Sequence, residues 1–221
     1  LICSEPCPHC GHDSYFLCDG WQSRLVDLGT LLRPHIVTGA VVGIMVGDEL
    51  LHMNLGYDNL VNLSQALRAQ FPEPAILYGN FEGSWITNDK LFPRVPESWD
   101  LVSADEYWNE NHTDDHTAGW PLAGKIYAQH LLPKMASHQK ALLVPGTFAS
   151  PATLANDDTQ AAAQLQQFLA FALNDSRVVG FSPWHFGNRS GADNASSTVP
   201  YIVGAEGMPK TLDVLQTIGR I

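Results

Sequence analysis

Short apolar runs alternate with helix-like segments along this sequence, and that order restricts the fold more than any other feature. Runs of this kind, rich in Val, Ile and Leu, are typical of strands buried in a parallel sheet. The predicted strands are 13–18, 41–47, 75–80, 100–105, 140–145 and 178–183, and the predicted helices are 20–32, 57–71, 122–138, 157–174 and a closing helix that begins at Pro209. Strands that alternate with helices imply a parallel sheet with right-handed crossovers.

This pattern predicts an α/β protein, specifically a partial (β/α) TIM-type barrel with about six of the eight strands. The chain has 221 residues, whereas such barrels usually have about 250. A doubly wound open sheet is the alternative architecture. No glycine-rich dinucleotide motif or P-loop is present, so we expect no cofactor. No linker divides the sequence, and we predict one domain, 1–221, with a Cys-rich N-terminal segment, 1–18.

The charge balance narrows the range of partners. The formal net charge is −11 and no basic patch stands out, which argues against nucleic acid and anionic membrane surfaces. No apolar run approaches the ~18–20 residues that span a bilayer, so membrane insertion is not expected. A carbohydrate is an uncharged partner that carboxylates can handle, and it fits this balance.

All four cysteines lie near the N-terminus, interleaved with two histidines. They are Cys3, Cys7, Cys10 and Cys18. The spacing of Cys7 and Cys10 is that of a zinc knuckle, and two local disulfides are the other interpretation. We favour disulfides because the chain also carries five Asn-x-Ser/Thr sequons, at Asn62, Asn111, Asn174, Asn188 and Asn194. Sequons and disulfides together predict a glycoprotein that is extracellular or in the secretory pathway.

Acids and aromatic residues gather where the predicted strands end. The candidates for catalysis are Asp48, Glu49 and Asp105, and those for substrate binding are Asn80, Glu82, Trp85, Glu106, Tyr107, Trp108, Trp184 and His185. In α/β barrels, chemistry takes place at the carboxyl ends of the strands. Carboxylates can protonate a glycosidic oxygen, and aromatic faces stack on pyranose rings, so this combination favours a sugar site.

With these residues the chain resembles the (β/α)8-barrel glycoside hydrolases. In many of those families a glutamate that closes the fourth strand is the acid/base, and the resemblance implies this role for Glu49. The sequence Gly47-Asp48-Glu49 is also similar to the Asp-Glu pair of β-hexosaminidases. There the aspartate orients the substrate's acetamido group, and the glutamate is the acid.

The sequence departs from the family at the seventh strand. The nucleophile is usually a glutamate there, but this strand runs into Pro145-Gly-Thr-Phe148 without an acid. This leaves Asp105 or Glu106 as the second carboxylate, substrate assistance, or loss of activity. A non-catalytic barrel used for carbohydrate binding or extracellular assembly is therefore the alternative function.

The sequence gives less support to two other chemistries. His112, Asp114, Asp115 and His116 have the composition of a metal site, although a polar loop explains them as well, and we predict no metal. A Ser nucleophile is unsupported because the sequence lacks a G-x-S-x-G elbow. A Cys nucleophile is unsupported because all the cysteines lie at one end of the chain.

Overall fold

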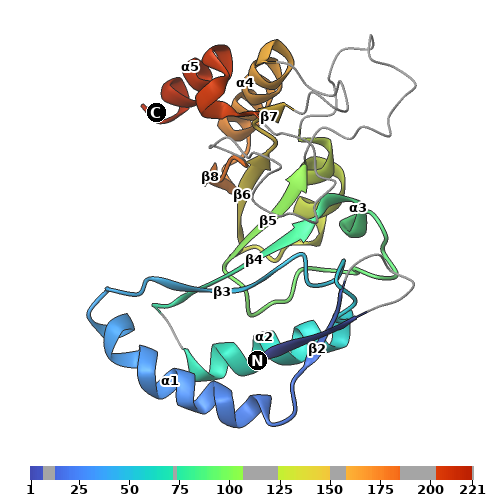
Figure 1. The fold of residues 1–221 in the computed structure, drawn as a ribbon, viewed down its shortest axis with the longest axis vertical. Coiled ribbons are helices and arrows are strands. Elements are labelled where there is room, and N and C mark those ends of the chain that lie inside the picture. The colour runs from blue at the N-terminus through green and yellow to red at the C-terminus, as the bar shows by residue number, and fades with distance from the viewer. Residues whose placement is uncertain (7–12, 72–73, 107–123, 150–157, 185–202, 221) are drawn as a thin grey trace. The chain divides into compact units, whose positions relative to one another are not determined.

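The computed structural model describes residues 1–6, 13–71, 74–106, 124–149, 158–184 and 203–220 (Figure 1). The chain divides into two compact units. Unit 1 comprises Leu1–Ala104 and His130–Ala141, and unit 2 comprises Asp105–Gln129 and Leu142–Ile221. Each unit is described by itself below.

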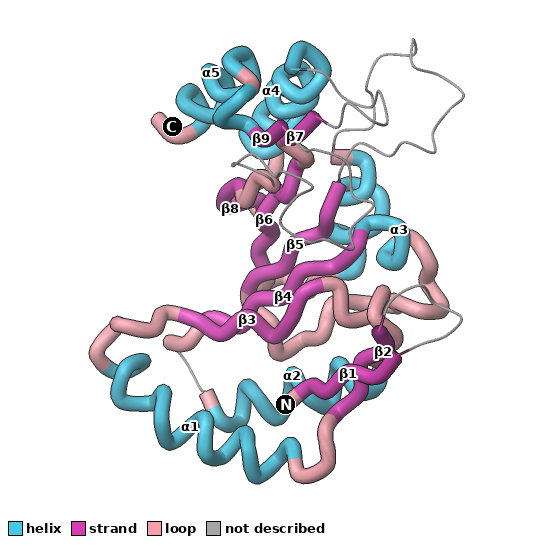
Figure 2. Tube along the Cα trace, viewed as in Figure 1, coloured by secondary structure: helices cyan, strands magenta, loops and turns pink. Residues whose placement is uncertain are grey.

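Five strands form the main sheet, in the order β3-β4-β5-β6-β8. Their bounds are Gly43–Asp48 for β3, Ile76–Glu82 for β4, Leu101–Glu106 for β5, Lys140–Pro145 for β6 and Val178–Phe181 for β8. The sheet is parallel and flanked by helices (Figure 2), which confirms the predicted α/β class and the partial barrel. The α-helices are α1 (Trp21–Val37), α2 (Tyr57–Gln70), α3 (Gly83–Ile86), α4 (Asp158–Asn174) and α5 (Pro209–Ile218).

Smaller elements complete the described structure. β1 (Ile2–Pro6) pairs with β2 (Asp13–Leu17), and β7 (Phe148–Ala149) pairs with β9 (Val203–Gly204), both antiparallel. A π-helix covers Tyr127–Leu131, and 3-10 turns cover Leu132–Lys134 and Ala205–Gly207.

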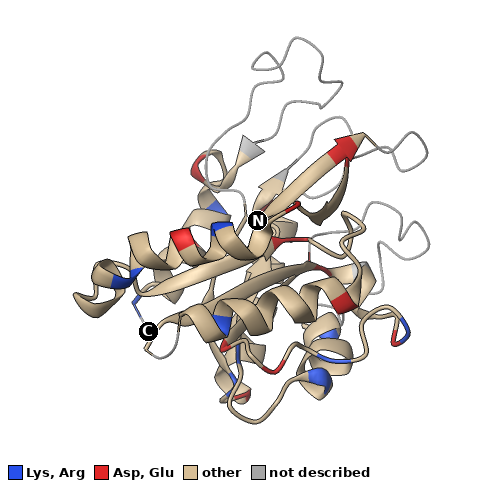
Figure 3. Cartoon of the chain, turned by 90° about the horizontal axis from the view of Figure 1, so that it is seen from below, with Lys and Arg blue, Asp and Glu red and all other residues tan. Residues whose placement is uncertain are grey.

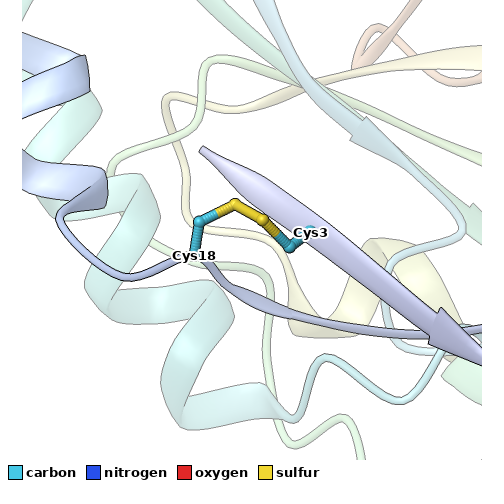
Figure 4. The surroundings of a disulfide bond; sticks show 2 residues. All are labelled: Cys3 and Cys18. Atoms are coloured by element: carbon cyan, nitrogen blue, oxygen red, sulfur yellow. A yellow bond between two sulfur atoms is a disulfide. The ribbon is translucent and has the colours of Figure 1, made fainter.

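The strand predicted at 13–18 is not part of the main sheet, so five rather than six predicted strands form it. It pairs with β1 as a hairpin, and a disulfide joins Cys3 to Cys18 across this pair (Figure 4). The backbone N–H of Tyr15 also donates to the carbonyl of Met53, in the loop after β3. Local pairing and the crosslink therefore hold this strand in the hairpin.

Two further expectations differ from the structure. Helix α1 continues through Pro34 to Val37, because in the last turn a proline removes one hydrogen bond without interrupting a long run of others. β3 is an edge strand in the sheet of described residues, with β4 as its neighbour. Val46 is buried, but Met45 is 53% exposed, so β3 is not buried on both faces.

Alternation along β4 separates the core of unit 1 from a polar face. Phe81 stacks on Trp99 with ring centroids 5.1 Å apart. Gly79 lies against the same indole, and a Cβ at Gly79 would come within 2.1 Å of it. The Trp99 Nε1–H donates to the Ser64 hydroxyl of α2, at 2.7 Å. Because neighbouring strand residues face opposite sides, Asn80 lies on the other face of β4, away from this core.

In unit 2, α4 packs against α5. Leu165 and Val214 are buried in their shared core. The Asp158 carboxylate accepts hydrogen bonds from the backbone N–H groups of Lys210 and Thr211, at 3.0 and 2.8 Å. Asp158 therefore caps the start of α5. The first residue of this helix is Pro209, as the sequence predicts.

The charged residues of the described segments are spread over several helices and loops (Figure 3). Within the described ranges, no helix combines the length and apolar character needed to cross a bilayer.

Candidate functional site

A chain of hydrogen bonds joins polar side chains of β3, β4 and β5 in unit 1. The Asn80 amide donates from Nδ2 to the Asp48 carboxylate, at 2.8 Å. The Ser103 hydroxyl donates to the amide oxygen of Asn80, and the Tyr78 hydroxyl lies 2.7 Å from the Ser103 oxygen. Since the Ser103 proton is directed at Asn80, Tyr78 is the donor to Ser103. The hydrogen bonds thus run in one direction, from Tyr78 through Ser103 and Asn80 to the Asp48 carboxylate, and they fix the orientation of that carboxylate.

Asp48 and Asn80 meet because their strands are in register. Both lie at the carboxyl ends of β3 and β4, and they are paired residues in the parallel ladder. The Asn80 side chain is buried, whereas Asp48 is exposed. A buried amide therefore holds an accessible carboxylate at the end of the sheet where barrel enzymes place their chemistry.

Glu49 follows with a backbone conformation that is unusual for glutamate. Its φ is 46°, in the left-handed region, and its backbone N–H donates to the Asn80 carbonyl at 3.1 Å. The ladder also shifts register between Met45 and Gly47, an irregularity of the kind that a β-bulge produces. Bulges and left-handed residues recur beside active sites, where they redirect side chains at a cost of about 1–3 kcal/mol per strained residue. The rule that neighbouring strand residues point to opposite faces of the sheet therefore does not apply to Asp48 and Glu49.

Trp85 is held at two points after β4. Its backbone N–H donates to the Glu82 carboxylate at 3.2 Å, which caps α3. Its indole Nε1–H donates to His52 Nδ1 at 3.0 Å. Glu82 and Trp85, both predicted to bind substrate, are thus brought together, and His52 joins them.

In unit 2, both oxygens of the Glu106 carboxyl face the start of a helix. They accept from the backbone N–H groups of Gly124 and Ile126, at 3.1 and 3.4 Å. Burial raises the pKa of Glu106 to about 8, although these backbone donors act in the opposite direction. The neighbouring Asp105 is also buried. Glu106 thus anchors the segment after Gly124, and its role in substrate binding stays a prediction.

The buried Glu106 predicts a pH-dependent stability. Its pKa is about 8 when folded, against 4.5 for an ordinary glutamate. The contribution of the protonated Glu106 carboxyl to the stability of the folded chain is therefore fully present below pH 4.5, and it is lost as the pH rises toward 8. Relative to the Glu106→Gln variant, the free energy of unfolding should fall by up to about 1.4 kcal/mol per pH unit in this window. Urea unfolding at pH 5, 6, 7 and 8 measures this difference, and parallel pH profiles for the two proteins would contradict it.

Trp184 follows β8 and contacts the end of β6, both within unit 2. Its backbone forms a parallel bridge with Gly146, and its N–H donates to the Pro145 carbonyl at 3.0 Å. Its ring packs edge-to-face on Phe148, with centroids 5.1 Å apart, and is 37% exposed. Trp184 is therefore held by its backbone at the end of β6 and by its ring against Phe148 of β7.

The remaining predicted residues fall into two groups. Outside the described residues lie Cys7, Cys10, Tyr107, Trp108, Asn111, His112, Asp114, Asp115, His116, His185, Asn188 and Asn194. Asn62 on α2 and Asn174 at the end of α4 are exposed, and their glycosylation stays a prediction. Among the residues that the structure describes, no group of three or more His, Cys, Asp and Glu is arranged to hold a metal.

Tyr78, Ser103 and His52 were missed by sequence reasoning. Tyr78 and Ser103 stand two positions before Asn80 and Asp105, so the period of two along a strand was the available signal. His52 lies in an irregular loop, where no periodicity marks it.

Comparisons with known proteins bear on the fold. No protein-family model and no curated protein matches the sequence. Among solved structures, a GH113 β-mannanase from Alicyclobacillus acidocaldarius matches with a TM-score of 0.54 and 12% identity, over 91% of this chain and 63% of the mannanase. A Ruminococcus gnavus β-glucuronidase matches with a TM-score of 0.57 and 9% identity, over 91% of this chain and 36% of that protein.

The fold is similar to that of glycoside hydrolase barrels. A second GH113 β-1,4-mannanase matches over 98% of this chain and 67% of its own length, with a TM-score of 0.54 and 13% identity. The chain thus spans about two thirds of the mannanases and about a third of the glucuronidase. At these identities the likeness establishes architecture, and it confirms the predicted resemblance to (β/α)8-barrel glycoside hydrolases.

Proposed function

We propose that this chain carries part of a glycan-hydrolysing site, with Glu49 as the general acid/base. The observation that carries the proposal is the Asn80–Asp48 hydrogen bond at the carboxyl ends of β3 and β4, with Glu49 next to it on a left-handed backbone. A fixed carboxylate beside a second acid supplies the two groups that glycoside hydrolysis requires.

The second carboxylate is Asp48 or Asp105 in this proposal. Asp48 has an oriented carboxyl that is accessible to a substrate. Asp105, at the carboxyl end of β5 in unit 2, is the other predicted candidate. If an acetamido group of the substrate acts as the nucleophile, Asp48 would orient that group.

The proposed substrate is a neutral or N-acetylated glycan, for which mannan compounds are neutral first probes, and a β-glucuronide serves as an anionic comparison. The neighbouring structures belong to a β-1,4-mannanase and a β-glucuronidase, which act on these two classes. Secretion is part of the proposal, supported by the Cys3–Cys18 disulfide and by the five sequons.

One observation favours a second function, that of a non-catalytic glycan-binding or extracellular assembly module. The segment Pro145-Gly-Thr-Phe148 at the end of β6 contains no carboxylate, and its first three residues are buried. A barrel that lacks an acid at this strand end would retain a glycan-binding surface without the usual nucleophile.

The two functions are separated by testing the wild-type chain for both binding and turnover. Mannohexaose and p-nitrophenyl β-glucuronide are titrated by calorimetry, and sugar release is followed by chromatography over days. Hydrolysis supports the enzyme. Binding without hydrolysis supports the module, and the absence of both rejects the two proposals for these glycans.

A further inference from the structure

His52 lies in the loop that connects β3 to α2, three residues after Glu49. Backbone hydrogen bonds join Met53 N–H to the Glu49 carbonyl and Leu55 N–H to the Leu50 carbonyl, at 3.1 and 3.0 Å. Three buried leucines anchor the loop in unit 1: Leu50, Leu51 and Leu55. The position of His52 is therefore set by the same turn that follows the candidate acid.

The contact between His52 and Trp85 has a defined chemical direction. The indole N–H only donates, so His52 Nδ1 is the acceptor and carries no proton. In the neutral ring the proton is consequently on Nε2. The two rings meet edge-to-face, with an interplanar angle of 89° and centroids 6.1 Å apart. This arrangement fixes the plane of the indole as well as its N–H.

A fixed indole plane matters if Trp85 binds sugar. The Trp85 side chain is half-buried, which leaves part of the indole accessible. Ordering a mobile side chain on binding costs about 0.5–1.5 kcal/mol, and a side chain that is already ordered avoids that loss. Glu82 fixes the backbone of Trp85 and His52 fixes its ring, so the stacking surface is pre-formed.

We propose that His52 is a positioning residue that holds Trp85 as the stacking surface for a sugar bound beside Glu49. The inference rests on the proposed function and adds a residue that acts through Trp85. Nδ1 of His52 supplies the acceptor, and the loop that carries Glu49 thereby also orients the aromatic surface.

The test compares variants that keep or remove the acceptor. His52→Asn places an amide oxygen close to the position of Nδ1, and His52→Leu keeps the volume without an acceptor. Trp85→Phe keeps an aromatic ring but removes the donor, and Trp85→Ala removes the surface. Mannohexaose and p-nitrophenyl β-glucuronide are titrated in a Glu49→Gln background, so that the probe is not consumed. Thermal melts establish that each variant folds.

We expect His52→Leu and Trp85→Phe to weaken binding about 3- to 10-fold, and Trp85→Ala to weaken it at least as much. His52→Asn should bind within about twofold of the parent, because the acceptor is restored. A second measurement needs no glycan. His52→Leu should change the tryptophan emission spectrum of the parent protein, but not that of the Trp85→Phe protein.

The outcomes separate this inference from the function on which it rests. If Trp85→Ala weakens binding but His52→Leu does not, the positioning role is wrong and the glycan site stands. If the parent and the wild-type chain bind neither probe, the proposed function fails and the sugar-stacking role fails with it. The emission spectra then still decide whether His52 holds the Trp85 ring. Should His52→Leu fail to fold, Trp85→Phe together with His52→Asn gives the same comparison.

Discussion

Replacing Glu49 by glutamine is expected to lower glycoside hydrolysis by about 10²- to 10⁴-fold, the usual contribution of a general acid/base. Glutamine has the size of glutamate, and the backbone hydrogen bond from residue 49 to the Asn80 carbonyl is unaffected. The amide, however, neither gives nor takes a proton. The fold should therefore remain while the proton transfer is lost.

The size of the effect should depend on the leaving group. A sugar alkoxide must be protonated as it departs, whereas a nitrophenolate leaves without a proton. Glu49→Gln should consequently affect mannohexaose much more than a p-nitrophenyl glycoside. Asp213→Asn, at an exposed acid on α5, is the matched control and should keep wild-type rates. Unchanged hydrolysis of mannohexaose by the Gln variant would remove Glu49 from the mechanism.

Substituting Arg68 by methionine is expected to destabilise the folded chain by about 3 kcal/mol. Arg68 projects from α2, and its guanidinium donates to the carbonyls of Phe71, Ala75 and Ser98, at 2.8–3.3 Å. It also pairs with the Asp100 carboxylate. One side chain thus ties α2 to the segments that lead into β4 and β5.

The stability is lost because methionine leaves the hydrogen-bond acceptors of Arg68 without the guanidinium donor. Asp100 also accepts the backbone N–H of Leu77, at 2.7 Å, so its carboxylate cannot turn away without breaking the start of β4. The Arg68 and Asp100 side chains are 23% and 34% exposed, and solvent screening places the effect at the lower end for buried pairs.

Urea unfolding followed by circular dichroism measures the Arg68 effect. Arg68→Lys keeps the charge without the planar fork and should lose about half as much stability. Arg24→Met, at an exposed position on α1, is the control and should change stability by no more than about 0.5 kcal/mol. Equal losses for the Arg68 and Arg24 methionine variants would show that the hydrogen bonds contribute nothing net.

The local pattern of apolar and polar residues was sufficient to predict most helices and strands of the fold. The run 140–145 coincides with β6, and the helical stripe at 57–71 corresponds to α2 within one residue. Each of these segments has its own periodicity, which follows from backbone geometry alone. The sequence did not predict the hairpin of β1 and β2, because the pairing partner of a strand and the Cys3–Cys18 crosslink are not visible in its own periodicity.

Residue order alone predicted a candidate site at the ends of the strands, since an apolar run stops where acids and aromatic residues begin. The network within that site required the folded chain. Asn80 contacts Asp48 across 32 residues and Ser103 across 23, and these contacts depend on strand register. The register also shifts between Met45 and Gly47, in the strand that carries Asp48. Hydrogen bonds form only when donor and acceptor lie within about 3 Å of each other, however far apart the two residues are in the sequence. The pairing of the strands therefore decides which polar side chains become partners.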